Sequence, residues 1–181
     1  MPDNRTLSQE TNYDVSLIPE SLKKNAMAVV RKDLAELTIR SPKDAVLEVT
    51  YAITILNENA IDICYFREFQ DKFTRVNNIK ATLYDGKGKK IRRIPADEII
   101  DRSAISGFSI YEDNRMKYID PRYRTVPFTF EYSYTTNYNG ILDFPNWYFI
   151  SYYNVSVEHT GIKVNVPNGY KLRYLEKEPG F

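Results

Sequence analysis

The chain contains one cysteine and one histidine, Cys64 and His159, which form its sole possible thiol–imidazole pair. A catalytic cysteine reacts as a thiolate, which needs stabilisation by a helix N-terminus or a nearby histidine. Cys64 lies instead in the apolar, strand-like sequence Ile-Asp-Ile-Cys-Tyr-Phe. We therefore expect Cys64 to be an inert, buried residue. Replacing either side chain by alanine should leave any activity or binding intact.

A second candidate site is the polar cluster formed by Glu112, Asp113, Asn114 and Arg115. Its oxygen atoms could bind a hard cation, but adjacent side chains on a strand point to opposite faces. The spacing also lacks the alternating oxygen ligands and the glycine of a calcium-binding loop. We expect a structural role, in which Arg115 pairs with a carboxylate and fixes a loop, and we predict no metal site.

The best candidate for a ligand-binding surface is the ring-rich stretch from Phe144 to Tyr153. Phe144, Trp147, Tyr148 and Tyr152 could stack against sugar rings or grip an extended peptide. Trp147 also lies in an irregular segment of the kind that often carries function. The alternative is that these rings, with Tyr153, fill the core of the domain and its open end. The sequence leaves open whether this stretch is surface or core.

The composition argues against several other classes of function. The chain has 25 basic and 24 acidic residues, so it has no strong field to attract nucleic acid. The basic run from Lys87 to Arg93 is typical of a solvated strand edge. One cysteine excludes an internal disulfide, and one cysteine with one histidine excludes a thiolate zinc site. We expect no cofactor, and no apolar run is long enough to form a transmembrane segment.

The elements that must position these residues are mainly strands. Rings alternate with polar residues from Phe128 to Tyr134, which predicts a half-buried strand at the centre of a sheet. Alternation is equally strict from Leu47 to Ile55. The sequence Asp85 to Gly88 predicts a tight hairpin, and phase changes near Asp33 and at Thr160-Gly161 predict bulges. We predict an all-β fold: an antiparallel β-sandwich of about eight to ten strands, with one or two short helical turns.

The length of 181 residues fits one domain. Residues 1–14 are polar and are expected to form a flexible lead-in. Residues 15–181 are expected to form a single β-sandwich domain. The first residues lack the apolar core of a signal peptide, and the last ones follow a strand-like stretch. We expect this chain to be the N-terminal fragment of a longer protein.

Five segments, taken in order, resemble one known family. They are Ala26 to Arg31, Ala52 to Asn57, Tyr84 to Gly88, Tyr111 to Lys117 and Pro127 to Tyr132. Together they are similar to domain of unknown function 3857, a β-rich domain that precedes the papain-like transglutaminase core of exported proteins, common in Bacteroidetes. The resemblance covers nearly the whole chain and implies a periplasmic or extracellular location. It implies no activity for this domain, and the catalytic Cys, His and Asp of the core have no counterpart here.

We therefore expect a non-catalytic accessory domain that positions or shields a downstream transglutaminase-like catalytic domain. Such a domain should expose an apolar patch that its partner covers. The alternative is an independent β-sandwich module that binds a glycan or a peptide through the aromatic stretch or an open sheet edge. A third hypothesis, a hydrolase that uses Glu112 and Asp113, gains no support from the spacing of the carboxylates.

Overall fold

The computed structural model describes residues 12–104, 114–140, 147–148 and 152–173. These residues form ten strands: β1 (Ala28–Ser41), β2 (Asp44–Ile55), β3 (Phe66–Gln70), β4 (Thr74–Asp85), β5 (Lys90–Ile94), β6 (Ile100–Ser103), β7 (Arg115–Ile119), β8 (Phe128–Asn139), β9 (Val155–Val157) and β10 (Thr160–Asn165). The helical segments are the 3-10 turns η1 (Val15–Leu17), η2 (Glu58–Ile63) and η3 (Ala96–Glu98) and the single-turn helix α1 (Glu20–Lys23). The predicted all-β fold is confirmed.

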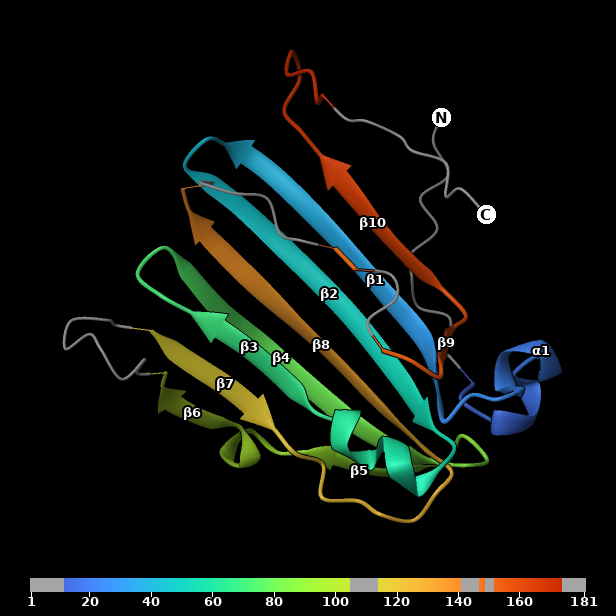
Figure 1. The fold of residues 1–181 in the computed structure, drawn as a ribbon. Helices are drawn as coiled ribbons and strands as arrows, with labels where there is room; N and C mark the ends of the chain where they lie inside the picture. Colours follow the sequence, from blue (N-terminus) through green and yellow to red (C-terminus); the bar gives the residue numbers. More distant parts are fainter. Residues whose placement is uncertain (1–11, 105–113, 141–146, 149–151, 174–181) are drawn as a thin grey trace.

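Seven of the strands form one large sheet, in which β9 and β10 lie along the outer side of β1 and the order continues β1-β2-β8-β4-β5 (Figure 1). The pairs from β1 to β5 are antiparallel. β9 and β10 run parallel to β1, where the sequence predicts an antiparallel sheet. β8 also runs parallel to β1, because both are antiparallel to β2, so β9 and β10 have the same direction as the strand that precedes them in the chain.

The core lies between this sheet and a second, three-stranded sheet of order β3-β7-β6. Alternation in β2 and β8 sends one set of side chains toward the smaller sheet. The register pairs Ile53 with Phe130 and Ile55 with Phe128, and all four are at most 1% exposed. Phe66 of β3 is also buried, and its ring meets those of Tyr132 and Tyr134 edge-on at centroid distances of 5.1 and 5.3 Å. These contacts join the two sheets.

The two predicted phase changes are present, each displaced by a residue or two. The register of β1 shifts between Val30 and Lys32, so the bulge lies at Arg31 and leaves Asp33 opposite Tyr51 on the inner face. The second irregularity is the break between β9 and β10, which precedes Thr160. A bulge exchanges the faces of the sheet to which all later side chains of the strand point. The position of the bulge at Arg31 therefore decides the face on which Asp33 lies.

The predicted hairpin joins β4 to β5 and anchors the N-terminal segment. Asp85 Oδ1 accepts hydrogen bonds from the backbone N–H groups of Lys87 and Lys89, both at 2.9 Å. Gly88 has φ +74°, and a Cβ there would lie 2.7 Å from the backbone nitrogen of Asp14. The Asp14 backbone pairs with Lys87, and Tyr13 is 1% exposed. The last residues of the predicted lead-in therefore belong to the folded domain, while residues 1–11 lie outside the described residues.

Candidate functional site

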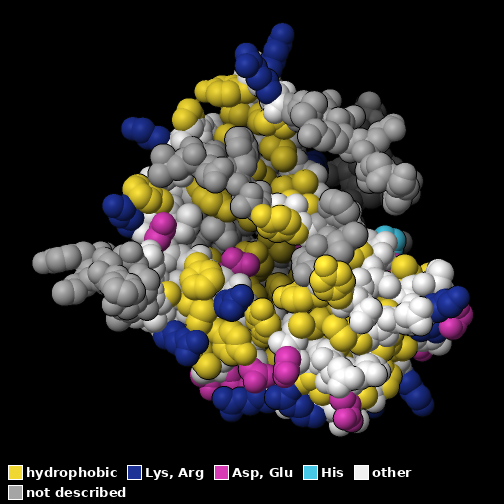
Figure 2. Space-filling model, in the orientation of Figure 1, with side chains coloured by type: hydrophobic (Ala, Val, Ile, Leu, Met, Phe, Trp, Pro, Cys, Tyr) yellow, Lys and Arg dark blue, Asp and Glu magenta, His cyan; other side chains and the backbone are white. Residues whose placement is uncertain are grey.

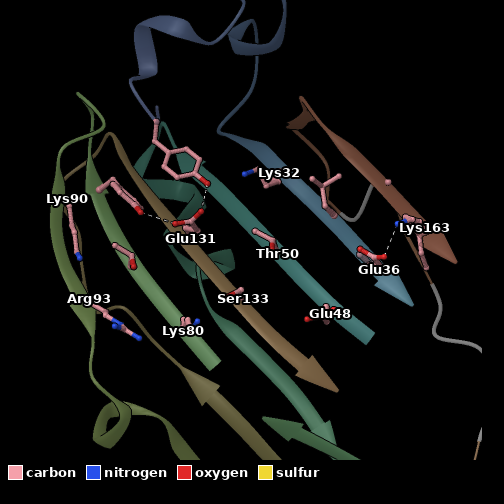
Figure 3. Close-up of a pocket in the computed structure, with 17 residues that line it drawn as sticks. Lys32, Glu36, Glu48, Thr50, Lys80, Lys90, Arg93, Glu131, Ser133 and Lys163 are labelled. Carbon is pink, nitrogen blue, oxygen red and sulfur yellow. Dashed lines mark hydrogen bonds and ion pairs between the residues drawn. The ribbon is translucent and has the colours of Figure 1, made fainter. Parts of the chain in front are cut away.

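The face of the large sheet that points away from the three-stranded sheet is polar. The strand register places Thr50 beside Ser133 and Glu131 beside Thr82 on this face. A groove of about 1040 Å³ follows the face (Figure 3). The residues that line this polar groove are Tyr13, Lys32, Leu34, Ala35, Glu36, Glu48, Thr50, Lys80, Thr82, Tyr84, Lys90, Arg93, Glu131, Ser133, Gly161, Ile162 and Lys163.

Glu131 holds the N-terminal segment against the sheet at one end of the polar groove (Figure 3). The Tyr13 hydroxyl donates to its Oε1 at 2.6 Å, and the Tyr84 hydroxyl donates to its Oε2 at 2.9 Å. Burial and the bond to Glu131 raise the pKa of Tyr84 to about 12, so this phenol stays a donor. Both carboxylate oxygens of Glu131 thus have partners from within the domain.

The two long sides of the polar groove differ in how their charges are paired. On the β1–β10 side, Glu36 accepts a hydrogen bond from Lys163 Nζ at 2.9 Å, and this bond lowers the pKa of Glu36. On the β4–β5 side, Lys80, Lys90 and Arg93 are exposed. Among the described residues, no carboxylate oxygen lies within 4.0 Å of a charged nitrogen of these three side chains. This side of the groove therefore presents cations that have no ion-pair partner within the described domain.

The polar groove combines charged and hydroxyl-bearing side chains that can bind a ligand. A general base needs a carboxylate whose pKa is raised toward neutrality and whose oxygen can reach a substrate. Glu36 is held ionised by its cationic neighbour, and Glu131 is occupied by two phenols. The exposed cations and the hydroxyls of Thr50 and Ser133 are suited to contact polar or acidic groups of a ligand.

On the inner side of the large sheet, the structure places two carboxylates that sequence reasoning did not single out. Burial raises the pKa of Asp33 to about 6. Glu68 of β3 accepts a hydrogen bond from the Tyr134 hydroxyl at 2.8 Å, and burial raises its pKa in spite of that bond. In the sequence, each of these carboxylates occupies a strand position whose side chain points to the buried face. This can be recognised only when the strand register and the bulge at Arg31 are known.

Glu68 lies in a smaller hollow of about 200 Å³ where β3 approaches β2 and β8. The residues that line this aromatic hollow are Leu47, Val49, Glu68, Phe69, Thr74, Tyr134, Thr136, Tyr138 and Trp147. The hollow is on the side of the large sheet opposite to the polar groove, since Val49 and Tyr134 have the inward parity of their strands.

The structure divides the predicted aromatic surface between core and solvent. Trp147 is half-buried against the core cluster around Leu47, and its Nε1 donates to Thr160 Oγ1 at 3.2 Å. Tyr148 is 68% exposed and Tyr152 is 39% exposed. Phe144 lies outside the described residues. The aromatic stretch is therefore neither wholly surface nor wholly core.

The predicted polar cluster is described in part, because Glu112 and Asp113 lie outside the described residues. Arg115 begins β7, and its Nε donates to Asp101 Oδ1 of β6 at 2.8 Å. The carbonyl of Asn114 accepts a hydrogen bond from the backbone N–H of Ala104 at 2.8 Å. Arg115 thus forms an ion pair with Asp101, which joins two strands of the smaller sheet.

Cys64 and His159 lie in contrasting environments, one buried and the other exposed. Cys64 is 4% exposed in the main core cluster, and burial raises the pKa of its thiol. The side chain of His159 is 69% exposed, in the turn between β9 and β10. Within the described part of the chain, no three His, Cys, Asp or Glu side chains are grouped so that they could hold a metal ion. No helix among the described residues is long and apolar enough to cross a membrane.

The fold and the site define an all-β domain of two packed sheets that carries a polar groove on one face and an aromatic hollow on the other. A family model described as "Domain of Unknown Function with solved-structure structure (DUF3857)" matches residues 42–180. The chain belongs to this family, which confirms the resemblance seen in its sequence segments.

One solved structure with a similar fold is titled as that of a "putative protease" from Parabacteroides distasonis. The TM-score is 0.64 at 12% sequence identity, which shows a likeness of fold alone. The match covers 79% of this chain and 29% of that protein, so this chain spans less than a third of its neighbour's length. No curated protein matches the chain.

Proposed function

We propose that this chain is a non-catalytic interaction domain of a longer, exported protein, acting in the periplasm or outside the cell. In this role it positions or shields a downstream catalytic domain of the transglutaminase-like or protease-like kind. The observation that carries the proposal is the polar groove, whose β4–β5 side presents Lys80, Lys90 and Arg93 without ion-pair partners among the described residues.

The size and charge of the polar groove favour a protein surface as its occupant. At about 1040 Å³ it reaches the upper limit of the volumes, about 300–1,000 Å³, that enclose small ligands. Its charges are distributed along several strands. Complementary charges across an interface fix the orientation and register of two surfaces more than they add affinity. Positioning a neighbouring domain requires such fixed orientation.

Two further observations support the proposal from outside the groove. The chain belongs to the same family that its sequence segments resemble, and it is similar in fold to 29% of a protein described as a putative protease, so in that protein the similar region is part of a longer chain. Large apolar side chains are also exposed on the domain, among them Phe69, Ile100 and Tyr148, which are 58%, 42% and 68% exposed.

The proposal is tested by labelling lysines in the natural full-length protein and in this chain alone. An acetylating reagent and mass spectrometry give the labelling rate of each lysine. Lys80 and Lys90 lie in the polar groove, whereas Lys43 and Lys72 are exposed outside it and are the internal controls. We expect several-fold slower labelling of the two groove lysines in the full-length protein and equal labelling of the two controls.

Equal labelling of all four lysines in both proteins would refute this role for the polar groove. A gene that encodes no further domain after Phe181 would refute the accessory role itself. In the full-length protein, the charge reversals Lys80→Glu and Arg93→Glu should restore fast labelling of Lys90, because they remove the complementary charge from the interface.

A second candidate function is binding of a glycan or a peptide at the aromatic stretch. The observation in its favour is the exposure of Tyr148 and Tyr152, which are 68% and 39% exposed, in the same stretch of sequence as the half-buried Trp147. Trp147 emission measured against a panel of glycans and lysine-free peptides tests this function. A response to one class of ligand would support an independent binding module, and silence across the panel would count against it.

A further inference from the structure

We propose that the aromatic hollow is a binding site for one lysine side chain, carried by a segment of another domain or protein. This goes beyond the accessory role, because it assigns a ligand class to a second site. That site lies on the other side of the large sheet from the polar groove.

The hollow combines one carboxylate with several aromatic side chains. Glu68 and Phe69 come from β3, Tyr134 and Tyr138 come from β8, and Trp147 comes from the connection after β8. Figure 2 shows hydrophobic side chains gathered around the middle of this side of the molecule, with one acidic and one basic side chain among them. Aromatic faces carry negative potential and attract cations, as a carboxylate does. Both kinds of side chain therefore favour a positively charged ligand.

The carboxyl group of Glu68 has no counter-ion among the described residues. Tyr134 donates to its Oε1 at 2.8 Å, and no charged nitrogen of the described residues lies within 4.0 Å of it. The positive charge of its neighbour Arg67 acts to lower the pKa of Glu68, but Arg67 forms no ion pair with it, and its guanidinium carbon lies 5.2 Å from the centre of the Tyr65 ring and 5.9 Å from that of Phe69. A cation can thus pair with Glu68 without displacing an ion pair of the described domain.

The volume of the hollow restricts its occupant to one side chain. At about 200 Å³ it is smaller than the sites of about 300–1,000 Å³ that enclose drug-sized ligands. Leu47 and Val49 line it together with the rings, and they match the methylene stem of lysine, which packs on apolar surface while its ammonium group stays polar.

An apolar side chain of similar size would fit the volume of the hollow, but it would bring no positive charge to Glu68. It would cover Glu68 and take its charge further from water without a compensating cation, which costs free energy. The effect of burial is already present, since it raises the pKa of Glu68 above its ordinary value. A lysine ammonium group removes this penalty by supplying the missing opposite charge.

The test measures the binding of two short peptides to the 181-residue chain. One is acetyl-Gly-Gly-Lys-Gly-Gly-amide, and the other carries norleucine in place of lysine, which keeps the methylene stem and removes the charge. Trp147 is the single tryptophan of the chain and lines the hollow, so its emission reports binding directly. Titration calorimetry gives a second readout. We expect the lysine peptide to bind at least about ten-fold more tightly.

Three variants test which side chains of the hollow bind the lysine peptide. Glu68→Gln keeps the side-chain shape and an acceptor for Tyr134, and it should reduce binding of the lysine peptide to that of the norleucine peptide. Phe69→Ala removes an exposed ring and should weaken binding by about three-fold. Glu58→Gln makes the same chemical change at an exposed glutamate that lines neither the polar groove nor the hollow, and as the matched control it should bind like the wild type.

Equal binding of the two peptides to the wild type would overturn the proposal, as would binding of neither. Unchanged affinity in a folded Glu68→Gln variant would overturn it as well. If that variant fails to fold by circular dichroism, the comparison of lysine with norleucine on the wild type still decides. None of these outcomes depends on labelling in the polar groove, so this inference and the accessory role can fail separately.

Discussion

The packing of Phe66 between the two sheets leads to a prediction for the variant Phe66→Ala. The side chain is 1% exposed, and its ring meets two tyrosine rings of β8 edge-on, at 5.1 and 5.3 Å. Truncating a buried phenylalanine typically costs about 3–5 kcal/mol, because the lost transfer free energy adds to that of the cavity left behind. Each aromatic pair contributes about 0.5–1.5 kcal/mol beyond its buried area. We expect a loss of about 4 kcal/mol in the free energy of unfolding.

The matched control is Phe69→Ala, three residues further along the same strand. Phe69 is 58% exposed, so the same truncation should cost less than about 1 kcal/mol. Urea unfolding followed by far-UV circular dichroism gives both free energies by linear extrapolation. For a chain of this size, the loss expected for Phe66→Ala corresponds to a decrease of about 8–16 °C in Tm.

The comparison also identifies what joins the sheets. If Phe66→Ala and Phe69→Ala destabilise the protein equally, then Phe66 does not carry the contact between the sheets and the packing described above is wrong. A reduced urea m-value for Phe66→Ala would have a different meaning: the smaller sheet would unfold separately from the larger one.

Replacing Tyr13 or Tyr84 by phenylalanine removes one of the two phenols that bond to Glu131; calorimetry should show a loss of about 1.5–3 kcal/mol for each, and unchanged stability would contradict these bonds. Burial raises the pKa of Asp33 from 3.8 to about 6, so the folded state holds this proton more tightly than the unfolded chain. Wild-type stability relative to Asp33→Asn should therefore fall as pH rises from about 4 to about 6, and a pH-independent difference in Tm would contradict this. Because burial raises the pKa of Cys64 and covers its thiol, a disulfide reagent at pH 8 should modify the unfolded chain and spare the native one; rapid native modification would show an accessible thiol.

Much of the fold was predictable from local patterns. The alternation from Leu47 to Ile55 and from Phe128 to Tyr134 identified both central strands and their buried faces, because side chains on a strand alternate between two environments. The hairpin at Asp85 to Gly88 was equally clear, because few residues tolerate its backbone angles. The parallel pairing of β9 and β10 with β1 was not predictable, because the sequence of a strand does not specify which other strand pairs with it or in which direction.

The candidate site depended on the tertiary structure to a greater degree. The outward positions of Thr50 and Glu131 followed from strand parity, but their alignment with Lys80 and Arg93 in one groove depended on the order of the strands. The aromatic stretch attracted attention for its rings. The structure instead places Trp147 in the lining of the same hollow as Glu68, a carboxylate far from it in sequence.

The sequence by itself determined which residues form strands and which side of each strand is apolar, because both depend on neighbours one or two positions away. Only the tertiary structure decided which polar sides share a groove and where Asp33 lies after the bulge at Arg31. It also decided that Glu68 meets aromatic rings from two other segments. The physical reason is that charge pairing, burial and pKa depend on distances between segments of the chain. The pairing and register of the strands fix these distances.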